Sequence, residues 1–176
     1  MNRWQRFCRN TIVRFLFSLF LFWGCAAFLL GAILFFRYQS LASQYDLRAV
    51  GRVPQATQVI DGTGSLLGYL RGENAASPVE LSEISPYFIN ALIAREDSRF
   101  WRHVGTDYVG TVRAWTRNVK DKRFVQGAST LTMQLTRMTF GMRERTIKRK
   151  LLEMALAREV EKEYAKEEIL AHYINR

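Results

Sequence analysis

The stretch Arg95–Gly105, REDSRFWRHVG, follows directly on an apolar run and decides the fold. Ser85 and Pro86 are preferred residues for the cap and first turn of a helix, so the sequence predicts a helix over residues 85–97. The helical period then sets Glu96 at the end of the apolar stripe. Partial desolvation favours the protonated form of a carboxyl group, which makes Glu96 a candidate proton acceptor near neutral pH. An acid at a helix end is also commonly solvated surface, and the rest of the chain must decide between the two.

The composition favours an anionic partner. The chain has 176 residues, about one domain, and its 26 Lys and Arg against 16 Asp and Glu give a net charge of +10. Such a balance suits nucleic acid, anionic lipid or a phosphorylated substrate. The compartment of the basic residues decides among these partners.

A membrane anchor is predicted at residues 15–36, FLFSLFLFWGCAAFLLGAILFF, which carry no charge. A helix of this length spans a hydrocarbon core of ~30 Å. Four arginines precede it, so the positive-inside rule predicts a cytoplasmic tail at residues 1–14 and export of everything after the anchor. A cleaved signal peptide is the competing interpretation, but the run is long and no A-x-A cleavage site follows. Nucleic acid is therefore not an expected partner. Cys8 and Cys25 lie before and inside the anchor, ~25 Å apart along a helix, too far to pair.

Residues 37–80 are predicted as a connector with a β-hairpin, and residues 81–176 as a mainly α domain. The hairpin is expected from strands at 58–60 and 65–70 around the turn Asp61–Gly64. Its glycine spacing imitates a dinucleotide loop, but no amphipathic helix follows, so that motif is rejected.

A helix is expected over residues 107–119, with Val109, Val112 and Trp115 along one side. Further helices are expected from a Ser/Thr-rich cap to Phe140, over residues 146–164, and from Lys166 onward. The last helix has no capping signal, so the sequence predicts a C-terminally incomplete fragment.

Basic residues concentrate in the same region as Glu96. Spacings of four and three place Glu153 on one helix face with Arg149 and Lys150. A surface salt-bridge ladder is the ordinary interpretation of such a triplet. The free N–H groups of the helix that follows Gly127 suit a phosphate or diphosphate, especially beside basic side chains.

Four ordered motifs resemble those of the peptidoglycan glycosyltransferase domain, glycosyltransferase family 51, of class A penicillin-binding proteins and monofunctional transglycosylases. They are Glu96-Asp97-x-x-Phe100-x-x-His103-x-Gly105, Gly127-x-Ser129-Thr130-x-Thr132-x-Gln134, Arg149-Lys150-x-x-Glu153 and Lys166-x-x-Ile169-Leu170-x-x-Tyr173-Ile174-Asn175. Where the family has Gln-Gln this chain has Met133-Gln134, which resembles the 1C-type branch. The fifth motif of the family is not present.

The resemblance implies a lysozyme-like glycosyltransferase fold and polymerisation of lipid II into β-1,4-linked glycan, with inversion at the anomeric carbon and release of undecaprenyl diphosphate. Glu96 is then the general base and Glu153 the second catalytic acid, which assists at the donor diphosphate. The expected substrate-binding residues are Asp97, Ser129, Thr130, Gln134, Lys148, Arg149 and Lys150. No covalent cofactor and no metal site of the protein is expected, although Mg²⁺ at the substrate diphosphate fits this chemistry. A packing and hydrogen-bonding role is expected for His103, which has no sequence partner for a metal site or triad.

The expected location is the bacterial cytoplasmic membrane, with a single-pass anchor and the catalytic domain on the periplasmic or extracellular side. Lipid II, the growing glycan strand, the membrane and cell-wall synthesis proteins are the expected partners. Two alternatives stay open. A lytic, lysozyme-like enzyme would not need a basic cluster for a diphosphate, and a truncated chain could act as a non-catalytic lipid II-binding or assembly protein.

Overall fold

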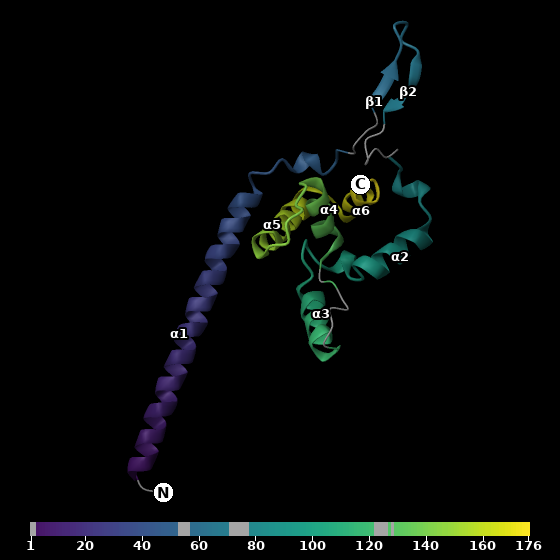
Figure 1. Cartoon of the computed structure of the whole chain (residues 1–176). Coiled ribbons are helices and arrows are strands. Elements are labelled where there is room, and N and C mark those ends of the chain that lie inside the picture. Colours follow the sequence, from purple (N-terminus) through teal and green to yellow (C-terminus); the bar gives the residue numbers. More distant parts are fainter. Residues whose placement is uncertain (1–2, 53–56, 71–77, 122–126, 128) are drawn as a thin grey trace. The chain divides into compact units, whose positions relative to one another are not determined.

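The computed structural model describes residues 3–52, 57–70, 78–121, 127 and 129–176. Its elements are the helices α1 (Arg3–Ala42), α2 (Pro86–Glu96), α3 (Tyr108–Asp121), α4 (Leu131–Thr139), α5 (Ile147–Glu163) and α6 (Lys166–Ile174), the 3₁₀ helices η1 (Leu47–Ala49), η2 (Leu81–Glu83) and η3 (Phe100–Arg102), and the strands β1 (Thr57–Ile60) and β2 (Leu66–Leu70) (Figure 1). The predicted mainly α fold, with an apolar N-terminal helix and a short hairpin, is confirmed for this part of the chain.

Helix α1 belongs to the first of two compact units, Met1–Ser40 and Leu41–Arg176. Among the described residues it is the one helix long and apolar enough to cross a membrane. Its most apolar 18 residues within Val13–Ala42 have a mean hydropathy of 2.4. Its large apolar side chains are exposed, as expected of a helix whose solvent is lipid. The helix continues to Ala42, into the stretch predicted as connector.

The hairpin forms where the sequence predicts it. β1 and β2 pair antiparallel, with Val59 opposite Gly68 and a register shift between Val59 and Ile60. The Asp61 carboxylate accepts hydrogen bonds from the backbone N–H groups of Thr63 and Ser65, each at 2.8 Å. These bonds shape the turn, and the hydroxyl of Thr63 is the largest cause that lowers the pKa of Asp61.

The second unit has its core around α4, which packs against both α5 and α6 (Figure 1). Eight buried side chains form the core: Val50, Ile93, Phe100, Leu131, Leu135, Val160, Ile169 and Leu170. One of them, Val50, comes from the connector directly after η1. The connector is thus part of the domain's core.

Side-chain caps fix where α4 and α5 begin. The hydroxyl of Thr130 accepts a hydrogen bond from Met133 N, and the hydroxyl of Thr146 accepts one from Arg149 N, at 3.2 and 3.1 Å. Each cap satisfies an N–H group that the first helical turn leaves without a partner. Ser85 occupies the N-cap position of α2 as predicted, although its hydroxyl makes no capping hydrogen bond.

The apolar side of helix α3 is largely exposed. Val109, Val112 and Trp115 lie along one side as predicted, but their side chains are about three-fifths exposed, and Ala114 is the buried residue of this helix.

The end of α6 holds the connector on both sides of the hairpin. Asn175 accepts a hydrogen bond from Val79 N at 2.7 Å and donates one to Val79 O at 2.8 Å. Arg176 donates to the carbonyl of Arg52, and the Tyr164 hydroxyl donates to the carbonyl of Leu47. These contacts close the domain where the chain enters it.

Acid is expected to destabilise the domain through His172 on α6. The ring of His172 stands edge-on to Tyr164, with centroids 5.4 Å apart, and burial lowers the pKa of His172 below its ordinary value of 6.5. Glu168 opposes this shift and Arg176 adds to it. Between the two pKa values the unfolded chain binds more protons than the folded one, so stability falls as the pH drops below about 6.5. Chemical denaturation at a series of pH values should show this loss, and His172→Gln should reduce it. Equal pH dependence in the two proteins would contradict the prediction.

Candidate active site

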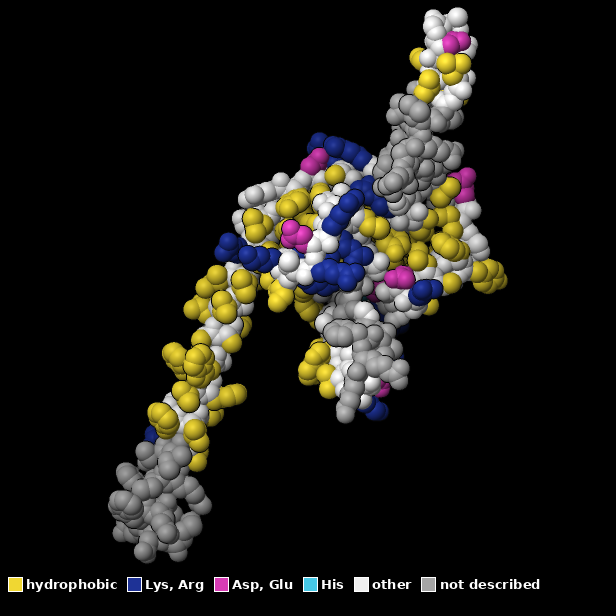
Figure 2. Space-filling model, viewed as in Figure 1, with side chains coloured by type: hydrophobic (Ala, Val, Ile, Leu, Met, Phe, Trp, Pro, Cys, Tyr) yellow, Lys and Arg dark blue, Asp and Glu magenta, His cyan; other side chains and the backbone are white. Residues whose placement is uncertain are grey.

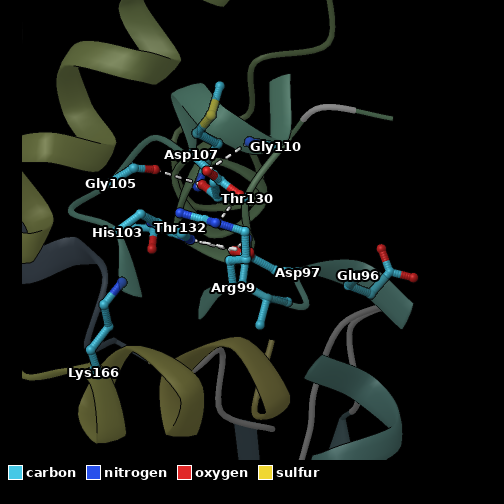
Figure 3. Close-up of polar contacts among 12 residues, drawn as sticks. Glu96, Asp97, Arg99, His103, Gly105, Asp107, Gly110, Thr130, Thr132 and Lys166 are labelled. Atoms are coloured by element: carbon cyan, nitrogen blue, oxygen red, sulfur yellow. Dashed lines mark hydrogen bonds and ion pairs between the residues drawn. The ribbon is translucent and has the colours of Figure 1, made fainter. Parts of the chain in front are cut away.

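Glu96 is the last residue of α2 and lines a cleft. Its side chain is 32 % exposed, and its Oε2 accepts a hydrogen bond from Gln134 Nε2 at 3.2 Å. The exposed Arg95 adds a contact of 3.5 Å from its Nε to the Glu96 carboxylate. In Figure 3 the carboxylate of Glu96 points away from the contacts around Asp97. Glu96 is therefore held by one amide while its acidic group stays open to the cleft.

Asp97, the next residue, faces the interior. Its side chain and that of His103 are each 4 % exposed, with Nε2 of the histidine 2.9 Å from Oδ2 of the aspartate. The same oxygen accepts a hydrogen bond from Leu131 N at 3.0 Å, at the first residue of α4. Asp97 thus ties the end of α2 to the start of α4. The hydrogen-bonding role predicted for His103 is confirmed, and substrate binding by Asp97 stays a prediction.

Thr130 and Gly105 fix the loop between η3 and α3. Thr130 is buried, and its hydroxyl donates to the carbonyl of Gly105 at 2.6 Å (Figure 3). Gly105 has φ +71°, and a Cβ built there would lie 2.7 Å from the backbone nitrogen of Arg158 on α5. The loop after Glu96 therefore approaches α5 too closely for any side chain.

The predicted basic triplet forms in the first turns of α5. Glu153 is 1 % exposed and lies 2.6 Å from Arg149 Nη1 and 3.5 Å from Lys150 Nζ. Lys150 also donates to the hydroxyl of Ser129 at 2.5 Å. Burial lowers the pKa of the Lys150 ammonium group, and Glu153 opposes that shift. Glu153 thus compensates two cations that would otherwise be costly to bury.

The cleft has a volume of about 410 Å³. Five of the predicted site residues line it, namely Glu96, Asp97, Ser129, Thr130 and Gln134. Glu153, Arg149 and Lys150 are not among its lining residues, and Lys150 reaches the cleft through Ser129. Lys148 is exposed on the first turn of α5, outside the cleft.

Arg137 and Tyr173 are not among the site residues predicted from the sequence, although Tyr173 belongs to the fourth motif. Arg137, half-buried on α4, lines the cleft one turn beyond Gln134. Tyr173 on α6 donates from its hydroxyl to Gln134 Oε1 at 3.2 Å. The three-residue spacing from Gln134 could have indicated Arg137, whereas nothing in the sequence pairs Tyr173 with α4.

Figure 2 shows Lys and Arg side chains gathered over α4, with few acidic side chains among them.

The side chains that line the cleft do not fit a metal site made by the protein without substrate. No group of three or more His, Cys, Asp or Glu side chains that could bind a metal ion occurs within the described residues. Asp97 is engaged by His103 and Leu131, and Asp107 by Arg99 and Gly110 N. Carboxylates already bound to donors and cations are poor ligands for Mg²⁺.

Comparison with known proteins yields one family and many relatives. Residues 63–176 match a family model described as Transglycosylase. The chain is 42 % identical over 122 residues to "Penicillin-binding protein 1A" of Aquifex aeolicus and 38 % identical over 138 residues to "Penicillin-binding protein 4" of Bacillus subtilis. These alignments cover 69 % and 78 % of this chain. A "Monofunctional glycosyltransferase" of Staphylococcus aureus is 42 % identical over 103 residues, which are 58 % of this chain and 38 % of that protein.

The chain spans only a small part of the penicillin-binding proteins that it matches. The aligned residues make up 17 % of the Aquifex aeolicus protein and 22 % of the Bacillus subtilis protein. The matched part includes the cleft and its surrounding helices, because the family model covers all residues from 63 onward.

Proposed function

Because the chain belongs to the transglycosylase family, we propose that it is a peptidoglycan glycosyltransferase of cell-wall synthesis that polymerises lipid II into β-1,4-linked glycan strands. One observation carries the proposal: the partly exposed carboxylate of Glu96 shares a cleft with the cation of Arg137 and the hydroxyl of Ser129. A base on one side and positive charge on the other are what transfer from a glycosyl diphosphate to a sugar hydroxyl requires.

In the proposed reaction Glu96 acts on the acceptor. Its Oε1, which Gln134 does not hold and which the exposed Arg95 contacts, takes the proton from the 4-hydroxyl group of the acceptor sugar as the hydroxyl oxygen attacks the anomeric carbon of the donor. The bond from this carbon to the diphosphate oxygen breaks, and the electron pair leaves with the undecaprenyl diphosphate. Attack from the face opposite the leaving group inverts the anomeric carbon. The contact with Gln134 keeps the carboxylate in place without neutralising it.

The leaving diphosphate is proposed to bind on the α4–α5 side of the cleft. Arg137 and the Ser129 hydroxyl line that side, and Lys150 is hydrogen-bonded to Ser129. A diphosphate would compensate the cost of burying the Lys150 charge, since an opposite charge favours the ionised amine. Glu153 would act through Arg149 and Lys150, which it orients. Mg²⁺ bound to the diphosphate stays a proposal, and no step here depends on it.

The anchor suits a substrate that never leaves the bilayer. Lipid II carries a long polyprenyl chain, so its polymerase has to work beside the membrane, and α1 contains a segment apolar enough to cross it. The proposed orientation has the N-terminus in the cytoplasm and the cleft on the periplasmic or extracellular side, because arginines crowd the N-terminal flank. Other cell-wall synthesis proteins are proposed partners.

Polymerisation by the full chain in lipid II-containing vesicles tests the function. We expect a muramidase-sensitive glycan polymer as product. Binding of lipid II without a polymer would support the non-catalytic alternative, whereas shortening of preformed glycan would support a lytic enzyme. Either result would overturn the proposed function.

Arg137→Gln is expected to lower polymerisation about 10- to 100-fold, because a charge-assisted hydrogen bond contributes about 1.5–3 kcal/mol. Initial rates of polymerisation measure the effect. Arg102→Gln is the matched control, since Arg102 is exposed on η3 and does not line the cleft. Equal rates in the two variants would remove Arg137 from the donor side.

A further inference from the structure

A chain of two hydrogen bonds leads from α6 to the proposed base. The Tyr173 hydroxyl donates to Gln134 Oε1, and Gln134 Nε2 donates to Glu96 Oε2, each at 3.2 Å. The three side chains come from α6, α4 and α2, and the first and last are 77 positions apart in the sequence (173 − 96). Gln134 is hydrogen-bonded to both ends.

The direction of both hydrogen bonds follows from the chemistry of the groups. An ionised carboxylate only accepts hydrogen bonds, so the NH₂ end of the Gln134 amide has to face Glu96. The carbonyl end then faces Tyr173, and a carbonyl oxygen can only accept. The tyrosine must therefore be the donor. A flipped amide would bring two acceptors together at Glu96, so the carboxylate sets the orientation of the amide and Tyr173 holds its other end.

The surroundings keep Tyr173 a donor. Burial, and then the negative charge of Glu96, raise the pKa of the Tyr173 hydroxyl above its ordinary value of 10.0, while Arg137 opposes the shift. The hydroxyl therefore stays protonated at neutral pH, where it can donate a hydrogen bond. Its helix is firmly placed, since Ile169 and Leu170 of α6 are core residues and Asn175 holds Val79.

We propose that Tyr173 is a positioning residue, which holds the carbonyl end of the Gln134 amide and so keeps its NH₂ end on the Glu96 carboxylate. Its catalytic consequence rests on the proposed function, but the fixed amide does not. Gln134 then has a role besides lining the donor side: it transmits the placement of α6 to the base on α2. Tyr173 itself does not line the cleft.

Tyr173→Phe tests the proposal, because it removes the hydroxyl and keeps the ring. Tyr164→Phe is the matched control, since Tyr164 is also half-buried and loses only its bond to the Leu47 carbonyl. In the full chain we expect Tyr173→Phe to lower kcat about 5- to 20-fold with little change in KM for lipid II. Tyr164→Phe should change kcat less than about twofold.

A second readout does not need turnover. With ¹⁵N-labelled glutamine, the side-chain NH₂ protons of Gln134, assigned through Gln134→Ala, should exchange with solvent faster in Tyr173→Phe than in the wild type, and at an unchanged rate in Tyr164→Phe. An inactive wild-type chain with this difference in exchange would refute the proposed function and support the positioning role. Equal exchange in wild type and Tyr173→Phe, or equal loss of activity in both tyrosine variants, would overturn the positioning role.

Discussion

Replacing Glu96 with Gln is expected to lower glycan polymerisation by about 10²- to 10⁴-fold, the usual contribution of a positioned general base. The substitution keeps the size of the side chain and an oxygen for the Gln134 contact, but it removes the proton acceptor. Because the cleft is otherwise intact, binding of lipid II should stay within about threefold of the wild type. Initial rates and vesicle binding measure the two effects separately.

The control for this variant is Glu167→Gln, the same substitution at an exposed position in the first turn of α6. It should polymerise lipid II at the wild-type rate. Turnover of Glu96→Gln within about twofold of this control would exclude Glu96 as the base. Loss of lipid II binding together with turnover would instead assign Glu96 to substrate binding.

Gly105→Ala should have the largest effect on stability. The new Cβ would lie 2.7–2.9 Å from backbone atoms of Ala157 and Arg158, which a rotamer change cannot move, and φ at this position is +71°. Strain and overpacking together are expected to reduce the free energy of unfolding of the domain by about 2–5 kcal/mol. Denaturant unfolding of the full chain in detergent measures the change.

Gly141→Ala separates the two causes. Gly141 also has a positive φ, +61°, but a Cβ there would meet no atom within 4 Å. This variant should lose only about 1–2 kcal/mol, the cost of the left-handed conformation for an alanine. If both alanine variants lose the same amount, the close approach of the loop to α5 contributes nothing to stability.

The sequence predicts most of the helices because their signals are local. Ser85–Pro86, Thr130 and Thr146 each stand at a helix start, and the structure has α2, α4 and α5 begin there. The side of α3 shows the limit of such signals. Helical periodicity reveals that Val109, Val112 and Trp115 share a side, but an amphipathic pattern does not state what that side contacts.

The sequence predicts those contacts of the site that lie within a single helix. The spacing of Glu153 from Arg149 and Lys150 gives their contacts directly, because all three lie on α5. The bond from Lys150 to Ser129 and that from Asp97 to Leu131 join different elements. They depend on tertiary packing, which no spacing along one helix contains. For the same reason the sequence did not show that Asp97 is buried while its neighbour Glu96 is open to the cleft.

The closure of the domain by α6 has a consequence for the order in which the chain folds. Three contacts, two from the end of α6 and one from Tyr164 just before it, join residues 96, 117 and 124 positions apart, at Asn175–Val79, Tyr164–Leu47 and Arg176–Arg52. Pairings this distant close long loops and form slowly, whereas the neighbouring helices α4 and α5 can pair early. A newly made chain therefore cannot make all of these connector contacts until residues 164–176 are available. Refolding should accordingly show α4–α5 protected from hydrogen exchange before η1, and the base, held through α6, would be among the last groups to reach its working position.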